Sequence, residues 1–348
     1  MPICFRPYRD IRRGPASRGP ADLALVARLE AALGVTIARD PEIDFEDWIE
    51  PACILDALIE AGVAVTVLAP RSRLTHIEVA FEIPGRAVTP TMVLGRLSQT
   101  DDLDLPRIQA VWPVPGQEGL ANRYPELVAF AQNAGRRFLI VDMPGEPEDP
   151  GNAACPQAAL LGFAGKRVVV KQTRPAKAFP ATPVDVPAGI TADQASPFFF
   201  GVFDWHLARF EGLPKALLLQ DHVVMGFETR LFVVGGEVVA GAGCVEAHTP
   251  LDADSGFVSS FLETRRNQGP VLPHPHTRDV LVDFGRQVAA QAAAEGLTDF
   301  VLDVALGEGG PLVVEFNPGH NAGLYATPVQ PLVRAILARA ESRHHAAA

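Results

Sequence analysis

The chain has 348 residues, of which 48% are hydrophobic and 20% charged, and its net charge is −11. This composition is that of a globular protein and excludes a disordered one, and the acidic balance argues against binding to the phosphate backbone of nucleic acids. No apolar run is long enough to span a bilayer, and the start MPICFRPYRD lacks the apolar segment of a signal peptide, so we expect a cytoplasmic protein without a membrane partner.

The cysteines lie far apart in the sequence and form no CxxC pair. This spacing favours neither a disulfide framework nor a structural zinc site. The cysteines are Cys4, Cys53, Cys155 and Cys244.

The first 145 residues predict a small α/β domain, because helical patterns ending at a glycine alternate with short apolar strands. Leucines spaced four residues apart mark the first helix, and Gly34 suits its C-terminal end. The predicted elements are helices at 20–34, 51–61 and 126–133, and strands at 63–68 and 138–141.

A segment rich in proline and glycine, residues 144–158, predicts a domain boundary. We therefore expect an N-terminal domain over 1–145, a second lobe over 150–222 and a third lobe over 223–348. The second lobe contains two predicted strands, at 167–171 and 216–220.

The third lobe predicts two β-hairpins and two helices. The first hairpin turns at Gly235-Gly236, a two-residue turn that requires positive φ. A polar, proline-containing segment at 250–277 is expected to be a mobile loop. The predicted elements are hairpins pairing 229–234 with 237–242 and 300–306 with 312–317, and helices at 278–295 and 331–340.

The second hairpin carries the main candidate site. If its turn is centred on Gly309, Asp303 faces Glu315 directly, with Cβ atoms about 5 Å apart, and Asn317 lies on the same face. Two facing carboxylates repel each other, and a divalent cation bound between them would remove this repulsion. Hard oxygen ligands of this kind suit a magnesium ion that also binds nucleotide phosphates. The alternative is a pair of carboxylates on a solvated face. The opposite, apolar face is expected to carry Leu302, Val304, Leu312, Val314 and Phe316.

Cationic side chains precede this hairpin. Arg230 shares a strand face with Glu228, and its planar, permanently charged guanidinium suits phosphate oxygens, although a simple ion pair is the alternative. Lys171 ends an apolar strand and so lies at the edge of a cleft, or else begins a surface loop. Residues 221–223, a polar linker that follows the buried strand, can present backbone groups to an adenine ring.

The order of these features resembles the ATP-grasp superfamily. The matching stretches are RVVVKQ at 167–172, LLLQDHVVMGFETRLFVVGGEVVAG at 217–241 and DFVLDVALGEGGPLVVEFNPGHNAGLY at 299–325. The segment from Lys171 to Phe179 and the ending EFNPGHNAGLY are most similar to the clade named for replacing a family arginine with lysine. The resemblance implies an α/β ATP-grasp fold in which two lobes hold the nucleotide, preceded by a pre-grasp domain.

The resemblance also implies roles for individual residues. Arg230 and Lys171 would be catalytic, acting on the transferring phosphoryl group and the nucleotide phosphates. Contacts to ATP would come from Lys171, Lys177, Gln220, Asp221, Val223, Glu228 and Arg230. Magnesium, or manganese, would be bound by Asp303, Glu315 and Asn317. Asn321 and Tyr325 would contact the substrate.

The resemblance implies an ATP-dependent carboxylate–amine ligase that forms an amide through an acylphosphate, acting on an amino acid or peptide, and a homodimer is common in the superfamily. One departure stands out, because residues 172–188 contain no glycine where many relatives have a glycine-rich flap over the phosphates. Either the flap is built differently, or Lys177 and Arg174 close over the phosphates. A small-molecule phosphotransferase and a non-catalytic nucleotide-binding module therefore stay as alternatives.

Overall fold

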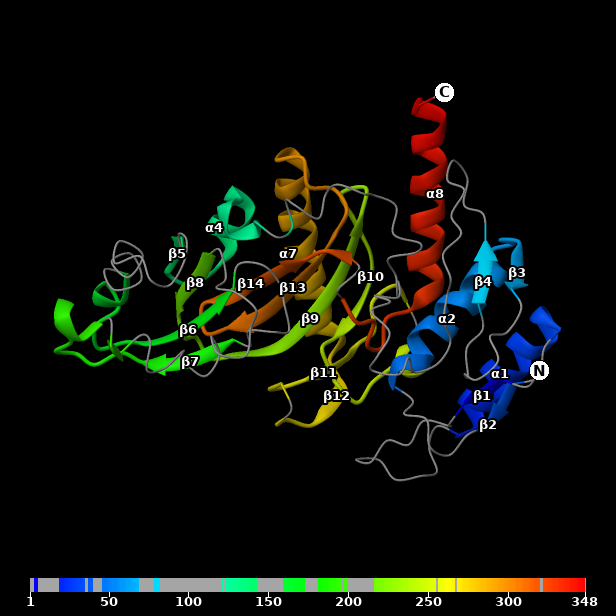
Figure 1. Cartoon of the computed structure of the whole chain (residues 1–348), viewed down its shortest axis with the longest axis horizontal. Coiled ribbons are helices and arrows are strands. Elements are labelled where there is room, and N and C mark those ends of the chain that lie inside the picture. The colour runs from blue at the N-terminus through cyan, green and yellow to red at the C-terminus, as the bar shows by residue number, and fades with distance from the viewer. Residues whose placement is uncertain are drawn as a thin grey trace.

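The protein is described here by a computed structural model in which the main sheets lie side by side along the longest axis (Figure 1). The described residues are 3–5, 19–34, 37–39, 46–68, 78–81, 121, 123–142, 159–172, 181–195, 197–198, 216–254, 256–266, 268–319 and 322–347. No helix in these ranges is both long enough and apolar enough to cross a membrane.

The N-terminal elements lie at one end of the molecule, beside the C-terminal helix (Figure 1). They comprise helices α1 (Gly19–Leu33) and α2 (Glu46–Glu60), a parallel pair of strands, β1 (Ile3–Phe5) and β2 (Ile37–Arg39), and an antiparallel pair, β3 (Val65–Leu68) and β4 (Glu78–Phe81). Both predicted helices are confirmed, but α2 begins before Pro51, where the sequence prediction started it. Arg28 of α1 donates to both carboxylate oxygens of Asp56 in α2, which ties the two helices together.

The first four-stranded sheet has the antiparallel order β5-β8-β6-β7. Its strands are β5 (Phe138–Asp142), β6 (Arg167–Gln172), β7 (Thr182–Asp185) and β8 (Ala216–Asp221). A 3-10 turn, η2 (Tyr124–Glu126), and a short helix, α4 (Val128–Asn133), precede β5. Although the sequence prediction placed β5 in the N-terminal domain, it is hydrogen-bonded along its length to β8. The limits at residues 145, 150 and 222 stay predictions.

The second four-stranded sheet has the order β10-β9-β13-β14, again antiparallel. Its strands are β9 (Met225–Val234), β10 (Glu237–Gly243), β13 (Phe300–Gly307) and β14 (Gly310–Asn317), which confirms both predicted hairpins. Helix α7 (Pro275–Ala294) packs on the face carrying Leu231 and Leu302, and α8 (Val329–Ala347) packs with α1 and α2 on the face carrying Phe232 and Val301. Side-chain alternation along the strands thus gives the sheet a core on each face.

The expectation of a loop over 250–277 is wrong. This segment contains a 3-10 turn, η3 (Pro250–Asp252), and two paired strands, β11 (Phe261–Glu263) and β12 (Val271–Pro273), and α7 begins within it. The Asp254 carboxylate accepts hydrogen bonds from the backbone N–H of Ser260 at 2.9 and 3.0 Å, and Ser259 and Ser260 are buried. Local hydrogen bonds therefore satisfy the polar side chains that suggested a solvated loop.

Candidate active site

The predicted pairing of Asp303 with Glu315 is confirmed, but it arises differently from the prediction. Gly307 pairs with Gly310, so the turn is two residues long and shorter than predicted. A β-bulge between Asp303 and Val304 then restores the predicted register, because Val314 is the extra residue on β14. Val313 is consequently fully buried in the core, where Val314 was expected to lie.

Asp303 forms a two-pronged ion pair with Arg230, its register partner on β9. The guanidinium donates from Nε to Oδ1 at 2.9 Å and from Nη2 to Oδ2 at 2.7 Å, the fork geometry of a strong arginine–carboxylate pair. The Asp303 side chain is 1% exposed and that of Arg230 is 11% exposed. Burial alone would lower the pKa of Arg230, but the charge of Asp303 outweighs it and holds that pKa well above its usual value.

Glu315 pairs with Lys171, which reaches across from the first sheet. The distance from Lys171 Nζ to Glu315 Oε2 is 2.8 Å, and the lysine side chain is 10% exposed. Burial alone would raise the pKa of Glu315, but the charge of Lys171 lowers it to about 2. Glu315 in turn raises the pKa of Lys171 against the opposing effect of burial. The ion pair therefore connects the two four-stranded sheets across the site.

Asn317 bridges the two carboxylates. Its Nδ2 donates to Asp303 Oδ2 at 3.1 Å and to Glu315 Oε1 at 3.2 Å. Ionised carboxylates only accept hydrogen bonds, so the orientation of the carboxamide follows from its partners. The expectation that Asp303 and Glu315 repel each other without a metal is wrong, because Arg230 and Lys171 already neutralise them.

Glu228 lies beside this cluster and pairs with Arg266, which follows β11. The distance from Arg266 Nη1 to Glu228 Oε1 is 3.8 Å, and the glutamate side chain is 16% exposed. Burial, followed by the charge of Asp303, raises the pKa of Glu228 to about 7. The ion pair that the sequence suggested between Glu228 and Arg230 is thus replaced by two separate pairs, each with another partner.

The segment after β14 folds back over Arg230. The Tyr325 ring centroid lies 5.1 Å from the guanidinium carbon, and Tyr325 adopts the uncommon φ of 49°. Arg230 Nη1 donates to the Gly323 carbonyl at 3.2 Å, and the Leu324 N–H donates to Glu50 Oε1 of α2 at 2.7 Å. The N-terminal region thereby contributes to the shape of the site.

The remaining predicted residues fall into two groups. Gln220 is the last residue but one of β8, and its Oε1 accepts a hydrogen bond from Arg136 Nε at 2.9 Å. The carboxylate of Asp221, which ends the strand, pairs with Arg137 at 3.1 Å, and Val223 is half-buried just beyond the strand. Lys177 and Asn321 lie outside the described residues, as do Arg174 and His320.

Sequence reasoning missed Arg136, Arg266 and Glu50. Each lies far along the chain from the residue that it contacts, and their positions carry no motif. The only local signal is the glycine at 135, which predicted no more than the end of a helix.

The donor set fits a divalent cation that shares its ligands with phosphates. Two carboxylates and a carboxamide at Asp303, Glu315 and Asn317 offer hard oxygen atoms of the kind magnesium prefers. Within the described part of the chain, no group of three or more histidine, cysteine, aspartate or glutamate side chains is placed to hold a metal alone. The remaining ligands would come from nucleotide and water.

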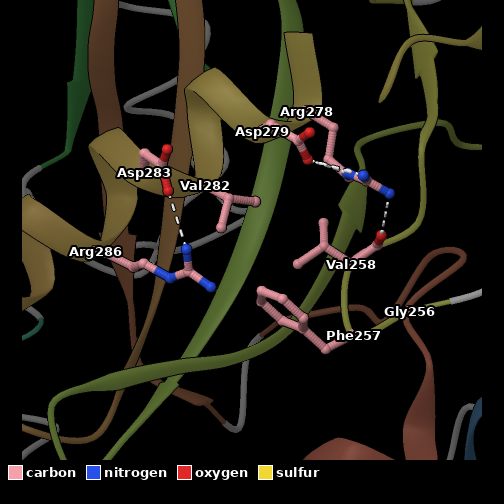
Figure 2. Close-up of a pocket in the computed structure, with 8 residues that line it drawn as sticks. All are labelled: Gly256, Phe257, Val258, Arg278, Asp279, Val282, Asp283 and Arg286. Atoms are coloured by element: carbon pink, nitrogen blue, oxygen red, sulfur yellow. Dashed lines mark hydrogen bonds and ion pairs between the residues drawn. The ribbon is translucent and has the colours of Figure 1, made fainter. Parts of the chain in front are cut away.

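A separate pocket of about 480 Å³ lies between α7 and residues 256–258 (Figure 2). Its charged lining residues pair with one another: Arg278 with Asp279 at 2.8 Å, and Arg286 with Asp283 at 2.9 Å. It contains none of the site residues described above.

Residues 192–336 match the model of an ATP-grasp domain family, the third family of the arginine-to-lysine clade. This part of the chain therefore has the α/β ATP-grasp fold. The matched model is one of the arginine-to-lysine clade, the clade that the sequence resemblance implied. The matched segment contains Arg230 and the complete hairpin from Asp303 to Asn317, whereas Lys171 lies before it.

Comparison with curated proteins finds no match. Similar solved structures include a RimK domain protein ATP-grasp from Sphaerobacter thermophilus (15% identity, 60% of this chain and 62% of that chain, TM-score 0.33) and D-alanine–D-alanine ligase from Bacillus anthracis (14%, 66% and 68%, 0.35). Cdc123 from Schizosaccharomyces pombe is another (12%, 59% and 86%, 0.33). The chain spans less than two thirds of the RimK domain protein.

Proposed function

We propose that the protein is an ATP-dependent ligase that joins a carboxylate to an amine, with an amino acid or peptide among its substrates. The observation that supports this most is the neutral cluster of Asp303 with Arg230 and Glu315 with Lys171, bridged by Asn317. This cluster lies in and beside a segment that has the ATP-grasp fold.

The cluster contains both the cations and the anions that a metal–nucleotide complex requires. Lys171 and Arg230 would exchange their carboxylate partners for oxygens of the triphosphate, a group that carries more negative charge than a carboxylate. Asp303, Glu315 and Asn317 would hold magnesium, which when bound neutralises charge on the phosphates. Asn317 would then rotate its carboxamide to present Oδ1, because its Nδ2 donates to the carboxylates in their ion-paired state.

The reaction we propose has two steps. A carboxylate oxygen of the first substrate attacks the γ-phosphorus of ATP, the bond to the β–γ bridging oxygen breaks, and ADP leaves. The nitrogen of the second substrate then attacks the acyl carbon, the carbon–oxygen bond to phosphate breaks, and the amine loses a proton. Such transfers depend on positioning and charge stabilisation and need no protein nucleophile. Arg230 supplies that stabilisation at the phosphoryl group.

Other contacts are proposed on the same basis. Gln220, Asp221 and Val223 would line the adenine site, and Lys177 would reach the phosphates from residues outside those described. Glu228 would place the nucleotide or a partner side chain, and Tyr325 with Asn321 would face the acceptor. A homodimer in the cytoplasm is the setting that we propose.

An ADP-release screen tests the function. The full chain is incubated with ATP, magnesium and pools of amino acids and short peptides, and positive pools are analysed by mass spectrometry. We expect ADP together with an amide product, and the Asp303→Asn variant serves as the inactive control. A phosphorylated compound without an amide would show a phosphotransferase, and ATP binding without ADP in any pool would show a non-catalytic module. Either result would overturn the ligase proposal.

A further inference from the structure

Arg136 lies where the segment before β5 meets β8 and β14. Its Nε donates to Gln220 Oε1 at 2.9 Å. Its Nη1 donates to the carbonyl oxygens of Ala134 and Val313 at 2.7 and 2.8 Å, and its Nη2 donates to that of Val314 at 3.1 Å. The guanidinium is planar, so three bonds to backbone carbonyls fix the direction of Nε and hence its bond to Gln220.

Gly135 explains why the arginine can approach β14 so closely. Its φ is +62°, a conformation that favours glycine, and a Cβ atom at this position would lie 2.9 Å from the Cβ atom of Leu312. The chain therefore turns sharply after α4 and delivers Arg136 against the carbonyl groups of β14. The backbone conformation at Gly135 thus sets the position of Arg136.

The contact with Arg136 fixes which end of the Gln220 carboxamide is free. A guanidinium only donates hydrogen bonds, so the atom facing it must be the carbonyl oxygen, and the NH2 group points the other way. Among the described residues none accepts a hydrogen bond from this NH2 group, yet it is not one of the atoms that are both buried and unpaired, so it keeps some contact with solvent. A ligand can therefore reach it.

The carboxamide also faces the correct side of its sheet. Along β8, Leu217 and Leu219 pack in the core of the first sheet, whereas Leu218 packs with residues of β13 and β14. Gln220 shares the face of Leu218 and therefore faces the second sheet, where Lys171 meets Glu315. A nucleotide with its phosphates at Lys171 would place its base toward this strand end.

We propose that Arg136 is a positioning residue for base selection, which locks Gln220 so that it offers a hydrogen-bond donor, and only a donor, to the nucleotide base. The inference rests on the proposed function, because it takes Gln220 as part of the adenine site. On the Watson–Crick edge, adenine presents N1 as an acceptor, whereas guanine carries a hydrogen on N1. A donor held opposite N1 binds adenine but meets the N1–H group of guanine, whereas an unlocked glutamine could rotate to suit either base.

The test measures equilibrium binding of ATP and GTP to the full chain by calorimetry, without magnesium so that turnover does not contribute. Wild-type protein is compared with Arg136→Gln, Arg136→Lys, Gln220→Glu, Gln220→Ala and the double variant Arg136→Gln/Gln220→Ala. The matched control is Arg123→Gln, which removes the same charge from an exposed arginine of the same segment that pairs with Glu126. Inorganic tripolyphosphate reports binding of the phosphates alone.

We expect both Arg136 variants to reduce the preference for ATP over GTP about tenfold, the change that one good hydrogen bond produces. Lysine should not rescue it, because an ammonium group lacks the fork that fixes Nε. Gln220→Glu keeps an acceptor for Arg136 and replaces the donor with an oxygen, so it should lose the preference while all bonds of Arg136 remain possible. Tripolyphosphate affinity and the Arg123→Gln variant should stay within about twofold of wild type.

The double variant separates positioning from general damage. If Arg136 acts through Gln220, the ratio of ATP affinity to GTP affinity should be the same in Gln220→Ala and in Arg136→Gln/Gln220→Ala. A wild-type ratio in both Arg136→Gln and Gln220→Glu would overturn the inference while leaving the proposed function intact. Wild-type protein that binds no ATP would overturn both. If Arg136→Gln fails to fold, Arg136→Lys and Gln220→Glu give the same decision.

Discussion

Lys171 Nζ and Glu315 Oε2 lie 2.8 Å apart and connect the two four-stranded sheets across the candidate site. The lysine side chain is only 10% exposed, so water replaces little of this contact when the pair separates. A ligand that enters between the sheets must therefore replace the ion pair with contacts of equal strength. The nucleotide and metal that we propose would do so, because together they bring both charges.

Neutralising Asp303 should abolish ADP formation. In Asp303→Asn the carboxamide cannot balance Arg230, which stays buried without its partner and costs about 3–5 kcal/mol of the free energy of unfolding. Glu315→Gln should also lose ADP formation, with a smaller loss of stability because the glutamate side chain is 29% exposed. A coupled ADP assay and urea unfolding measure the two effects. Full ADP formation in either variant would refute the metal assignment.

Arg230→Ala should lower the turnover number much more than the affinity for ATP, because its proposed role is to stabilise the charge that develops during transfer. Arg230→Lys should recover stability better than turnover, since a lysine keeps the charge opposite Asp303 but not the fork. The matched control is Arg286→Ala, an exposed arginine paired with Asp283 on α7. Equal turnover in wild type and Arg230→Ala would show that the arginine is structural.

Glu228 should make the protein less stable as the pH rises from about 4.5 to 7. Its pKa is raised to about 7 in the folded state, so between the unfolded value, about 4.3, and 7 the folded state holds more protons than the unfolded state. Stability is then lost as the proton leaves. Glu228→Gln should gain on the order of 3 kcal/mol relative to wild type at about pH 8 and little at about pH 4. Unfolding in urea at both pH values checks this, and a pH-independent difference would contradict it.

Glu50→Ala should loosen the segment that carries Tyr325. The Glu50 carboxylate accepts a hydrogen bond from the Leu324 N–H at 2.7 Å, and losing it should cost about 1–3 kcal/mol. We expect a higher KM for the acceptor substrate with little change in ATP affinity, and partial recovery in Glu50→Gln, which keeps an acceptor. The control is Glu60→Gln at the exposed end of α2. A change in ATP affinity alone would argue against this role.

Gly135→Ala should destabilise the protein more than Gly34→Ala. Both glycines have positive φ, near +62° and +66°, so both variants carry the backbone cost of about 1–2 kcal/mol. Only at Gly135 would the new Cβ meet another residue, Leu312, and this overpacking should add about 1–3 kcal/mol. Thermal and urea unfolding give the difference, and equal losses would show that the approach to β14 is not tight.

Patterns that repeat locally could be predicted from the sequence. Alternating residues and Gly-Gly or Gly-rich turns predicted both hairpins, and the facing pair of Asp303 and Glu315 was predicted correctly. The bulge at Val314 was not predictable, because it depends on how β14 meets Asp303 of the neighbouring strand and not on a residue preference. The wrong prediction at 250–277 came from composition, which does not show that Asp254 satisfies the backbone of Ser260.

The contacts of the site itself were the least predictable part. The sequence offered Arg230 and Lys171 as ligands for phosphate, but it suggested Glu228 and not Asp303 as the ion-pair partner of Arg230, and no partner for Lys171. Arg136 was missed because three of its four hydrogen bonds end on backbone carbonyls, which any residue type provides. Because such contacts do not require a particular residue type in the partner, they cannot be predicted from the sequence.

Val314, the extra residue of the β-bulge, contributes to the site through its backbone carbonyl and not through its side chain. Its carbonyl accepts from Arg136 Nη2 and lies 3.5 Å from Lys171 Nζ, whereas its own side chain is only partly buried. Deleting it would still leave Glu315 opposite Asp303, since the shorter strand would continue the register of the turn. The arginine and the lysine would then lose their shared acceptor. Position 314 should therefore accept many amino acids but not a gap.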